Sequence, residues 1–410
     1  MPRYAYLTCE LKSRDLDARL LVAAQLIARG MSVVVGQQWS MNVNAGHVPP
    51  GVFLFKSANS IQVEAARKVK TFGHRIIFMD EEVLAVISPY IIRQITGPGV
   101  FDVADVFLFQ SDKHREILNG SGPVVGSLRV DLLRDYRELY QAEADEFRRD
   151  GRYLLINTNY GLVNNAFANI PSILETTRQA GSIETETAEG RAYIQSWIDV
   201  ETRNKAEMEK LIGLLQGKLG DVRIVLRSHP TENPAPWTKF PDVHVVSGSA
   251  PTGWLLGAEF IVHTNSTTGM EAALLEKPVL NMNPKPNTPF SEQYVMNHAP
   301  PLAADAEEAA THILDALSKP SRREPATWLP TFPPQCATLV ADEIAARAIE
   351  SPAITRWDRL ERSDPQIKKF TVSPEEFVAR LKPFLVRAGI PSVEAVLLDD
   401  SVFLLKPANA

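Results

Sequence analysis

Hydroxyl and amide side chains gather at one strand-to-helix junction in the second half of the chain. The apolar run Phe260–His263 is typical of a buried parallel strand, and the polar turn after it contains Asn265, Ser266, Thr267 and Thr268. A helix starting there would direct unpaired backbone N–H groups and its positive dipole end at one point, which favours phosphate. The alternative is a plain N-cap, where Ser and Thr are common in any helix. Three consecutive hydroxyls beside an amide favour the ligand site.

A histidine provides the second candidate. The strand Val222–Leu226 continues toward His229, and Pro230 stops it because proline has no N–H to donate. At the carboxyl end of a central strand, the imidazole would lie near the Ser266 helix start and could donate to the same phosphate. The alternative is a packed or capping histidine.

Two charged residues accompany this candidate site. Arg227 could add positive charge for the donor, although arginines at such positions also lie on surfaces. Glu271, early in the following helix, could accept hydrogen bonds from ribose hydroxyls or could be a solvated helix glutamate.

Acidic residues follow a strand in the first half of the chain. The expected strand Arg75–Met79 leads directly into Asp80, Glu81 and Glu82. At least one carboxylate should face a ligand cleft, where a raised pKa would suit a general base. The alternative is an acidic helix N-terminus, which the helix dipole favours.

Further polar residues lie at expected strand ends. The candidates for binding the substrate carboxylate or the acceptor are Glu10, Lys12, Arg14, Arg129, Asn157 and Asn159. Lys12 and Arg14 could hold a carboxylate or phosphate, or be solvated charges at a helix start. A surface role is equally open for Arg129. The two asparagines could contact sugar hydroxyls or cap a turn.

Strand and helix patterns alternate, which predicts parallel sheets with helices on both faces. The strands expected in the first part are Tyr4–Cys9, Val33–Gly36, Val52–Phe55, Arg75–Met79, Val106–Phe109 and Pro123–Gly126. Those expected in the second part are Tyr153–Asn157, Val222–Leu226, Val243–Val246, Phe260–His263 and Val279–Met282. Gly-x-Gly-x-x-Gly and P-loop motifs are absent from the sequence, which disfavours a dinucleotide or P-loop enzyme.

Composition narrows the class of protein. The 410 residues carry a net charge of −6, which disfavours nucleic acid as the main partner. The two cysteines and the absence of a signal peptide or long apolar run favour a protein of the reducing cytoplasm. Close Cys pairs and His-x-x-x-His are also absent, so we expect neither a metal site nor a cofactor.

Seven segments carry a resemblance to a known family: Glu10–Ala23, Val33–Trp39, Met79–Glu82, Gly126–Asp131, Ile156–Gly161, Ser228–Glu232 and Thr264–Glu271. Through them the chain resembles bacterial surface carbohydrate biosynthesis proteins. More distantly it resembles the ulosonate-transferring glycosyltransferases of capsule and O-antigen (lipopolysaccharide) synthesis, which include Kdo transferases and GT-B sialyltransferases.

The resemblance also implies residue roles. In the sialyltransferase-like relatives, the histidine of His-Pro and a Ser/Thr motif hold the CMP phosphate, which implies that role for His229 and for Ser266, Thr267 and Thr268. The general base there belongs to an acidic motif that ends in glycine. Here Val83 follows Glu82, so the choice among the three acids, and the retaining or inverting outcome, stay open.

Together these observations predict an α/β GT-B fold with two Rossmann-like, doubly wound domains facing a central cleft. We expect an acceptor domain at 1–135, a linker helix at 136–151, a nucleotide-sugar donor domain at 152–300, and a helical tail at 301–410 packing on both domains. The expected function is metal-independent transfer of Kdo or a related nonulosonate from a CMP-activated donor to a surface glycan or glycolipid. Contact with the inner face of the inner membrane is left open.

Two alternatives remain. One is a UDP-sugar-dependent GT-B enzyme, either a hexosyltransferase or an epimerase. The other is a non-catalytic nucleotide- or glycan-binding protein.

Overall fold

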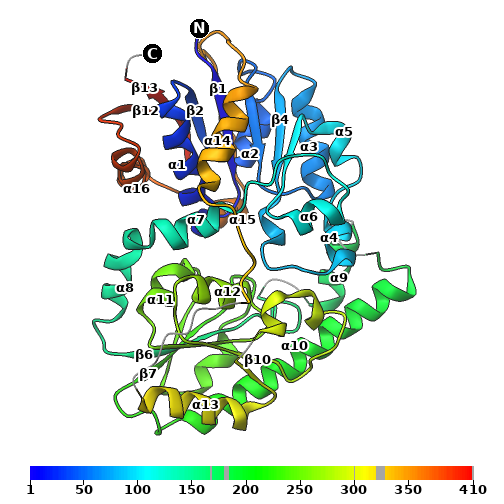
Figure 1. Cartoon of the computed structure of the whole chain (residues 1–410), viewed down its shortest axis with the longest axis vertical. Coiled ribbons are helices and arrows are strands. Elements are labelled where there is room, and N and C mark those ends of the chain that lie inside the picture. Colours follow the sequence, from blue (N-terminus) through cyan, green and yellow to red (C-terminus); the bar gives the residue numbers. More distant parts are fainter. Residues whose placement is uncertain (167–168, 180–183, 300, 320–327, 409–410) are drawn as a thin grey trace. The chain divides into compact units, whose positions relative to one another are not determined.

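The chain forms two compact units in a computed structural model that describes residues 1–166, 169–179, 184–299, 301–319 and 328–408 (Figure 1). The first unit comprises Met1–Glu82, Ile95–Leu132 and Thr331–Ala410. The second comprises Val83–Gln94 and Leu133–Pro330. This division differs from the expected one, because 136–151 and 301–330 both belong to the second unit. The expected boundary at residue 300 falls outside the described residues.

A seven-stranded sheet forms the centre of the first unit, in the order β12-β13-β2-β1-β3-β4-β5. Its strands are β1 (Tyr4–Cys9), β2 (Ser32–Gln37), β3 (Val52–Phe55), β4 (Arg75–Met79), β5 (Val106–Leu108), β12 (Val393–Asp399) and β13 (Val402–Pro407). Strands β1 to β5 run parallel, and β13 pairs antiparallel with β2. Aromatic and aliphatic residues such as Tyr6, Phe53, Phe55 and Phe78 form the core on one face.

Helices connect and cover these strands. Those with residues in the first unit are α1 (Lys12–Ala28), α2 (Gln38–Asn44), α3 (Ser60–Lys70), η1 (Glu81–Val83), α4 (Pro89–Ile95), α5 (Val100–Val103), α6 (Asp112–Ile117), α7 (Leu128–Asp135), α14 (Cys336–Ala346), α15 (Asp364–Lys369) and α16 (Pro374–Arg387). Three of them, η1, α4 and α7, also have residues in the second unit. The α3 helix shows how such elements begin, because Asn59 accepts a hydrogen bond from Gln62 N and caps the first turn.

Two expectations about the first unit are wrong. Pro123–Gly126 is not a strand, because only Val124 forms a bridge, with Phe109. The tail is not purely helical, because β12 and β13 form a hairpin that extends the sheet beyond β2. Phe403 of β13 stacks on Phe377 of α16 with ring centroids 3.9 Å apart, which fastens the tail to the sheet.

The second unit contains a six-stranded parallel sheet in the order β11-β10-β9-β6-β7-β8. Its strands are β6 (Tyr153–Asn157), β7 (Arg223–Arg227), β8 (Val243–Val246), β9 (Phe260–His263), β10 (Val279–Met282) and β11 (Leu302–Ala303). The main helices are α8 (Gln141–Phe147), α9 (Ile170–Gln179), α10 (Ala188–Leu215), α11 (Pro251–Gly257), α12 (Thr267–Leu274) and α13 (Ala306–Ser318), with short 3-10 turns at Arg137–Tyr140, Ala235–Lys239, Ser291–Gln293 and Val295–His298.

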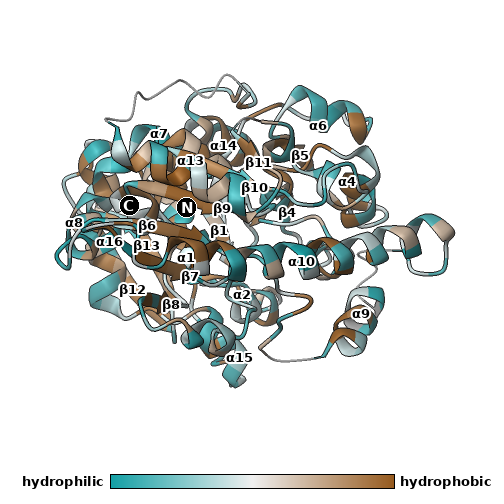
Figure 2. Cartoon of the chain, turned by 90° about the horizontal axis from the view of Figure 1, so that it is seen from below, coloured by the Kyte–Doolittle hydropathy of each residue, from teal (hydrophilic) through white to brown (hydrophobic). Residues whose placement is uncertain are grey.

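The burial of apolar side chains explains why helices pack on the faces of the second sheet. The residues of β6, β7 and β9 are almost all buried, and α10 packs on the sheet through Met208, Leu211 and Leu215. Figure 2 shows the central strands mostly brown and much of α10 teal, as a helix with one apolar side requires. Among the described residues, the helices all fall short of the length and apolarity needed to cross a membrane.

The contact between β2 and the tail hairpin depends on Gly36. A Cβ atom there would lie 2.4 Å from the carbonyl oxygen of Ser401 and 2.7 Å from Cα of Val402, both backbone atoms. We expect Gly36→Ala to separate the strands and lower the free energy of unfolding by about 1–3 kcal/mol. The control is Gly213→Ala in α10, whose Cβ would meet no atom within 4 Å, so that it should raise stability by roughly 0.5–1 kcal/mol. Thermal denaturation of both variants checks this, and equal stability of Gly36→Ala and wild type would contradict it.

Candidate functional site

The strand order of the second sheet reverses between β6 and β9, and in open parallel sheets the segments that follow two such strands diverge and leave a crevice. From β6 the chain proceeds to β7 and β8 on one side, and from β9 it proceeds to β10 and β11 on the other. In open parallel sheets, ligands bind at the carboxyl edge where the order reverses in this way. The register places Asn157 of β6 opposite both Arg227 of β7 and His263 of β9. The segments that follow these strands therefore leave the sheet at the same edge.

Two buried amide side chains flank this crevice without hydrogen-bond partners. Asn157 is 1% exposed and Asn265 is 3% exposed, and both amide atoms of each lack a partner. An unsatisfied buried polar group costs roughly 1–3 kcal/mol. Asn265 also has a φ of 47°, in the left-handed region that asparagine adopts more readily than most residues. Such features persist at ligand sites, where a ligand supplies the missing partners.

The α12 helix begins beside Asn265. Ser266 is its N-cap and accepts from Thr268 N at 3.3 Å, and the two hydroxyls lie 2.8 Å apart. Thr267, at the first helical position, is exposed. The helix approaches β9 closely, because a Cβ on Gly269 would lie 2.1 Å from His263 Nε2. Burial lowers the pKa of His263 to about 3, so this histidine stays neutral beneath the helix start.

His229 follows β7 at the same sheet edge and is half-buried. Its Nδ1 accepts from Thr231 N at 3.3 Å and lies 2.8 Å from Thr231 Oγ1. A backbone N–H can only donate, so the neutral ring carries its proton on Nε2. Gly161 leaves room for this turn, since a Cβ there would lie 2.4 Å from Thr231 Oγ1. The β6 and β9 segments also meet, because Asn159 Nδ2 donates to the Asn265 carbonyl at 3.3 Å.

Two strand spacings separate β7 from β9, so the carboxyl ends of these two strands lie roughly 10 Å apart. That span suits a ligand the size of a nucleotide phosphate with its sugar. His229 and Ser266 both follow strands of the same parallel sheet, at its carboxyl edge. Arg227 is buried and donates to the Ser249 carbonyl, Pro230 is exposed, and Glu271 is buried in α12.

The buried carboxylate of Glu232, which the sequence did not predict as a site residue, connects the turn after β6 with the turn after β7. Glu232 Oε1 accepts from Thr158 Oγ1 at 2.8 Å, from Tyr160 N at 2.9 Å and from His229 N at 3.3 Å. Glu232 thus fastens the turn after β6 to the turn after β7. Burial raises its pKa despite these donors.

A second buried acid, Glu201 of α10, holds the next part of the same loop. It accepts from Leu162 N at 2.8 Å, Val163 N at 3.1 Å and Trp197 Nε1 at 2.6 Å. Burial, together with the negative charge of Glu232, raises the pKa of Glu201 to about 7. In the sequence Glu201 is one acid within a long helix, so no pattern distinguishes it.

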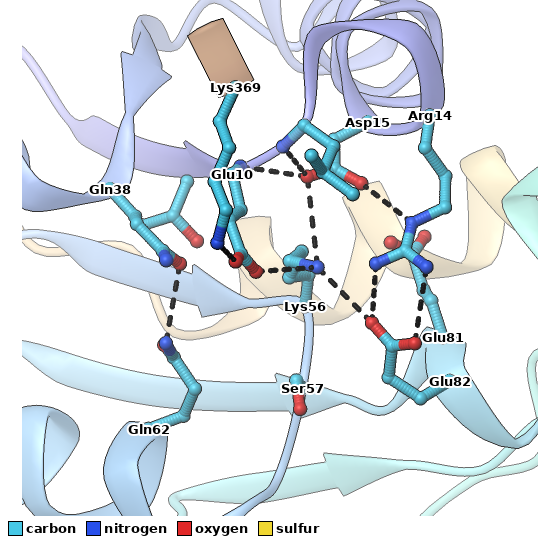
Figure 3. A network of polar contacts seen from close by, with 12 residues as sticks. Glu10, Arg14, Asp15, Gln38, Lys56, Ser57, Gln62, Glu81, Glu82 and Lys369 are labelled. Atoms are coloured by element: carbon cyan, nitrogen blue, oxygen red, sulfur yellow. Dashed lines mark hydrogen bonds and ion pairs between the residues drawn. The ribbon is translucent and has the colours of Figure 1, made fainter. Parts of the chain in front are cut away.

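The corresponding crevice of the first sheet, between β1 and β3, is filled by ion pairs (Figure 3). Lys56 follows β3 and is 1% exposed. Three carboxylates surround its ammonium group: Glu10 at 3.1 Å, Glu82 at 3.2 Å and Asp15 at 3.8 Å. Burial alone would lower the pKa of Lys56, but these carboxylates raise it. The lysine is therefore charged and its partners ionised.

Two arginines complete this network. Arg14 forms a bidentate pair with Glu82, at 2.5 and 3.2 Å. The fully buried Arg19 pairs with Glu81 at 3.1 and 3.2 Å. Burial opposes ionisation of Glu82, but Arg14 and Lys56 together lower its pKa. The predicted role of Arg14 as a ligand for a substrate carboxylate therefore competes with an ion pair inside the protein.

Asp80 differs from the other acids of its strand end. It is 1% exposed, and burial followed by repulsion from Glu82 raises its pKa to about 7. Its Oδ1 accepts from Glu82 N at 3.0 Å, while Gln110 Nε2 donates to its carbonyl. Asp80 can therefore exchange a proton near neutral pH.

Of the remaining predicted residues, Glu10 belongs to the Lys56 network and also contacts the tail. Lys12 pairs with Glu376 at 3.2 Å, and Lys369 of the tail donates to Glu10 at 2.8 Å. Arg129 lies half-buried on α7. Within the described part of the chain, His, Cys, Asp and Glu residues do not assemble into a group of three or more that could hold a metal.

Comparisons with known proteins define the class of fold. No protein-family model matches the sequence, and no curated protein matches it either. A solved structure of a putative UDP-N-acetylglucosamine 2-epimerase from Listeria monocytogenes is similar with a TM-score of 0.50 and 14% identity, covering 84% of this chain and 95% of the other. The chain has the GT-B fold, with two parallel-sheet Rossmann-like domains.

Two further solved structures are similar at lower scores. Methanocaldococcus jannaschii UDP-GlcNAc 2-epimerase in complex with UDP-GlcNAc and UDP gives a TM-score of 0.47 and 11% identity, covering 84% of this chain and 100% of the other. The wall teichoic acid polymerase TagF (H444N with CDPG) gives 0.48 and 10%, covering 84% and 88%.

The buried acids predict how stability changes with pH. Because the pKa of Glu201 rises from 4.5 to about 7 on folding, the folded state binds more protons than the unfolded state between these values. Stability should therefore fall as pH rises from about 4.5 to about 7, by up to about 3 kcal/mol from this residue. Glu201→Gln should be less stable but show a flatter slope. Urea unfolding at several pH values measures it, with Glu64→Gln, an exposed acid on α3, as control. An unchanged slope in Glu201→Gln would contradict the assignment.

Proposed function

We propose that this chain is a GT-B glycosyltransferase that moves an acidic sugar, Kdo or a related nonulosonate, from a CMP-activated donor to a bacterial surface glycan. The observation that carries the proposal is the pair of unpartnered, buried amides of Asn157 and Asn265 on the two sides of the second sheet's crevice. Each amide offers both a donor and an acceptor, which suits ribose hydroxyls or the edge of a pyrimidine. The resemblance in the His-Pro and Ser/Thr segments supports CMP in particular.

The phosphate in this proposal binds between His229 and the start of α12. Backbone N–H groups and the positive dipole end of α12 favour an anion. The Nε2–H tautomer of His229, set by Thr231, supplies a side-chain donor. As the bond to the sugar breaks, negative charge grows on the CMP leaving group, and these donors stabilise it. The protein donors thereby take the role that a divalent cation plays in other transferases.

The two alternative functions would use the same crevice, but one differs from the proposed function in its ligand and the other in lacking catalysis. A UDP-sugar-dependent enzyme would use the same phosphate site with a uridine base. A non-catalytic binding protein would retain the nucleotide site without turnover. The test therefore measures CMP and UDP side by side, and then turnover of CMP-Kdo with an acceptor glycan by mass spectrometry.

The variant Asn157→Leu should change CMP binding without lowering the stability of the protein. Replacing an unsatisfied buried amide by an apolar group of similar size should leave the free protein as stable as wild type or about 1 kcal/mol more stable. CMP affinity, in contrast, should fall at least about tenfold, because one hydrogen-bonding side of the crevice is lost. Calorimetric titration with CMP and urea unfolding measure the two effects.

The matched control is Asn204→Leu. Asn204 is a buried residue of α10 whose amide oxygen also lacks a partner, but it does not follow a strand of the crevice. It should leave CMP affinity unchanged, whatever its effect on stability. If Asn157→Leu binds CMP with wild-type affinity, the assignment of the nucleotide site to this crevice is wrong. A preference for UDP in the wild type would sink the CMP assignment and leave the crevice standing.

For the proton acceptor we propose Asp80, because Glu81 and Glu82 are held in arginine ion pairs. A base with a pKa of about 7 is active only when ionised, so turnover should rise as pH increases through about 7. Asp80→Asn should lower turnover by at least about 100-fold and abolish this rise, while CMP affinity stays at the wild-type value. An Asp80→Asn protein that keeps the wild-type pH profile would exclude Asp80 as the base.

A further inference from the structure

The first sheet ends in a long strand with a free side. β12 has seven residues and lies at the edge of its sheet, where β13 is its single neighbour in the described chain. The other described sheet edges are short: β5 has three residues, β8 has four and β11 has two. A long edge strand presents a row of backbone N–H and C=O groups to any strand that can pair with it.

β12 lacks the usual protection against such pairing. Its sequence, VEAVLLD, contains neither proline nor lysine. Its one central acid, Glu394, is neutralised by Lys406 of β13 at 3.0 Å. The irregularity in its pairing with β13 lies between Leu397 and Asp399, so Val393 to Leu397 keep a regular register. Five consecutive residues are therefore available for another strand.

The side chains of β12 divide between a covered and an open face. Val396 and Leu398 pack against the core cluster of the first unit. Leu397 points to the opposite face, where it pairs with Phe403, and it is 50% exposed. Val386 of α16, the helix that packs on Phe403, is 69% exposed. Leu397 is therefore an apolar side chain that lies half exposed beside the unpaired backbone edge of β12.

We propose that β12 pairs antiparallel with β12 of a second copy of this chain, joining two first-unit sheets about a two-fold axis. The sequence of the strand suits itself as a partner. With the axis at Val396, Ala395 lies opposite the partner's Leu397, and Glu394 lies opposite the partner's Leu398. Apolar residues thus face apolar residues or the stem of a glutamate, and no two like charges meet. A two-fold interface requires this kind of self-complementary surface.

The interface is independent of the proposed nucleotide site, which lies in the second unit. It buries a small area, so we expect a reversible dimer with a Kd on the order of micromolar. Sedimentation velocity of the full chain over a range of concentrations should show a monomer that converts to a species of twice the mass. Hydrogen exchange should show concentration-dependent protection of the amides of residues 393–397.

Leu397→Lys tests the contact. The half-exposed position should tolerate lysine in the monomer, but two added charges near the axis should weaken the dimer at least about tenfold. The control is Ile61→Lys on α3, an equally non-conservative change at a residue 61% exposed away from β12. It should leave dimerisation unchanged. A wild-type chain that stays monomeric at all concentrations, or a dimer without protection of residues 393–397, would overturn the proposal.

Discussion

The reversal of strand order in each parallel sheet is the constraint on which both polar sites depend. It leaves a crevice at the carboxyl edge, between β1 and β3 in the first unit and between β6 and β9 in the second. Backbone geometry requires each crevice to be lined by the residues that follow the flanking strands. The two units fill it differently. The first crevice is closed by the Lys56 ion pairs, whereas the second is flanked by amides without partners.

Two buried glutamates fix the loops that surround the second crevice. Glu232 and Glu201 accept hydrogen bonds from backbone N–H groups of the turn after β6, and Glu232 also binds the turn that contains His229. Each carboxylate satisfies donors that would otherwise be buried and unpaired. These residues therefore position the loops on both sides of the crevice. The close approach of Gly269 to His263 has the same effect on α12, because it fixes where the helix start lies.

Much of this could be predicted from sequence because it follows from local patterns. Short apolar runs gave Tyr4–Cys9, Tyr153–Asn157 and Phe260–His263 with their observed bounds. The fold class followed from the alternation of strands and helices. The tail hairpin was missed, because β12 gains its strand conformation from pairing with β13 and β2 rather than from its own pattern. The strand order within each sheet was not predicted either, because it is a long-range property that no segment encodes alone.

Long-range contacts also explain why the base could not be chosen among the three adjacent acids. Asp80, Glu81 and Glu82 are adjacent in sequence and chemically alike, so sequence could not rank them as bases. The fold separates them by partner: Glu81 meets the buried Arg19, and Glu82 meets Arg14 and Lys56. Burying paired charges is costly, and apolar side chains of similar volume are often at least as stabilising. The gain in folding stability therefore does not by itself explain why these ion pairs lie at the carboxyl edge of the first sheet. Here Arg14 and Lys56 keep Glu82 ionised, and repulsion from Glu82 adds to burial in raising the pKa of Asp80 to about 7.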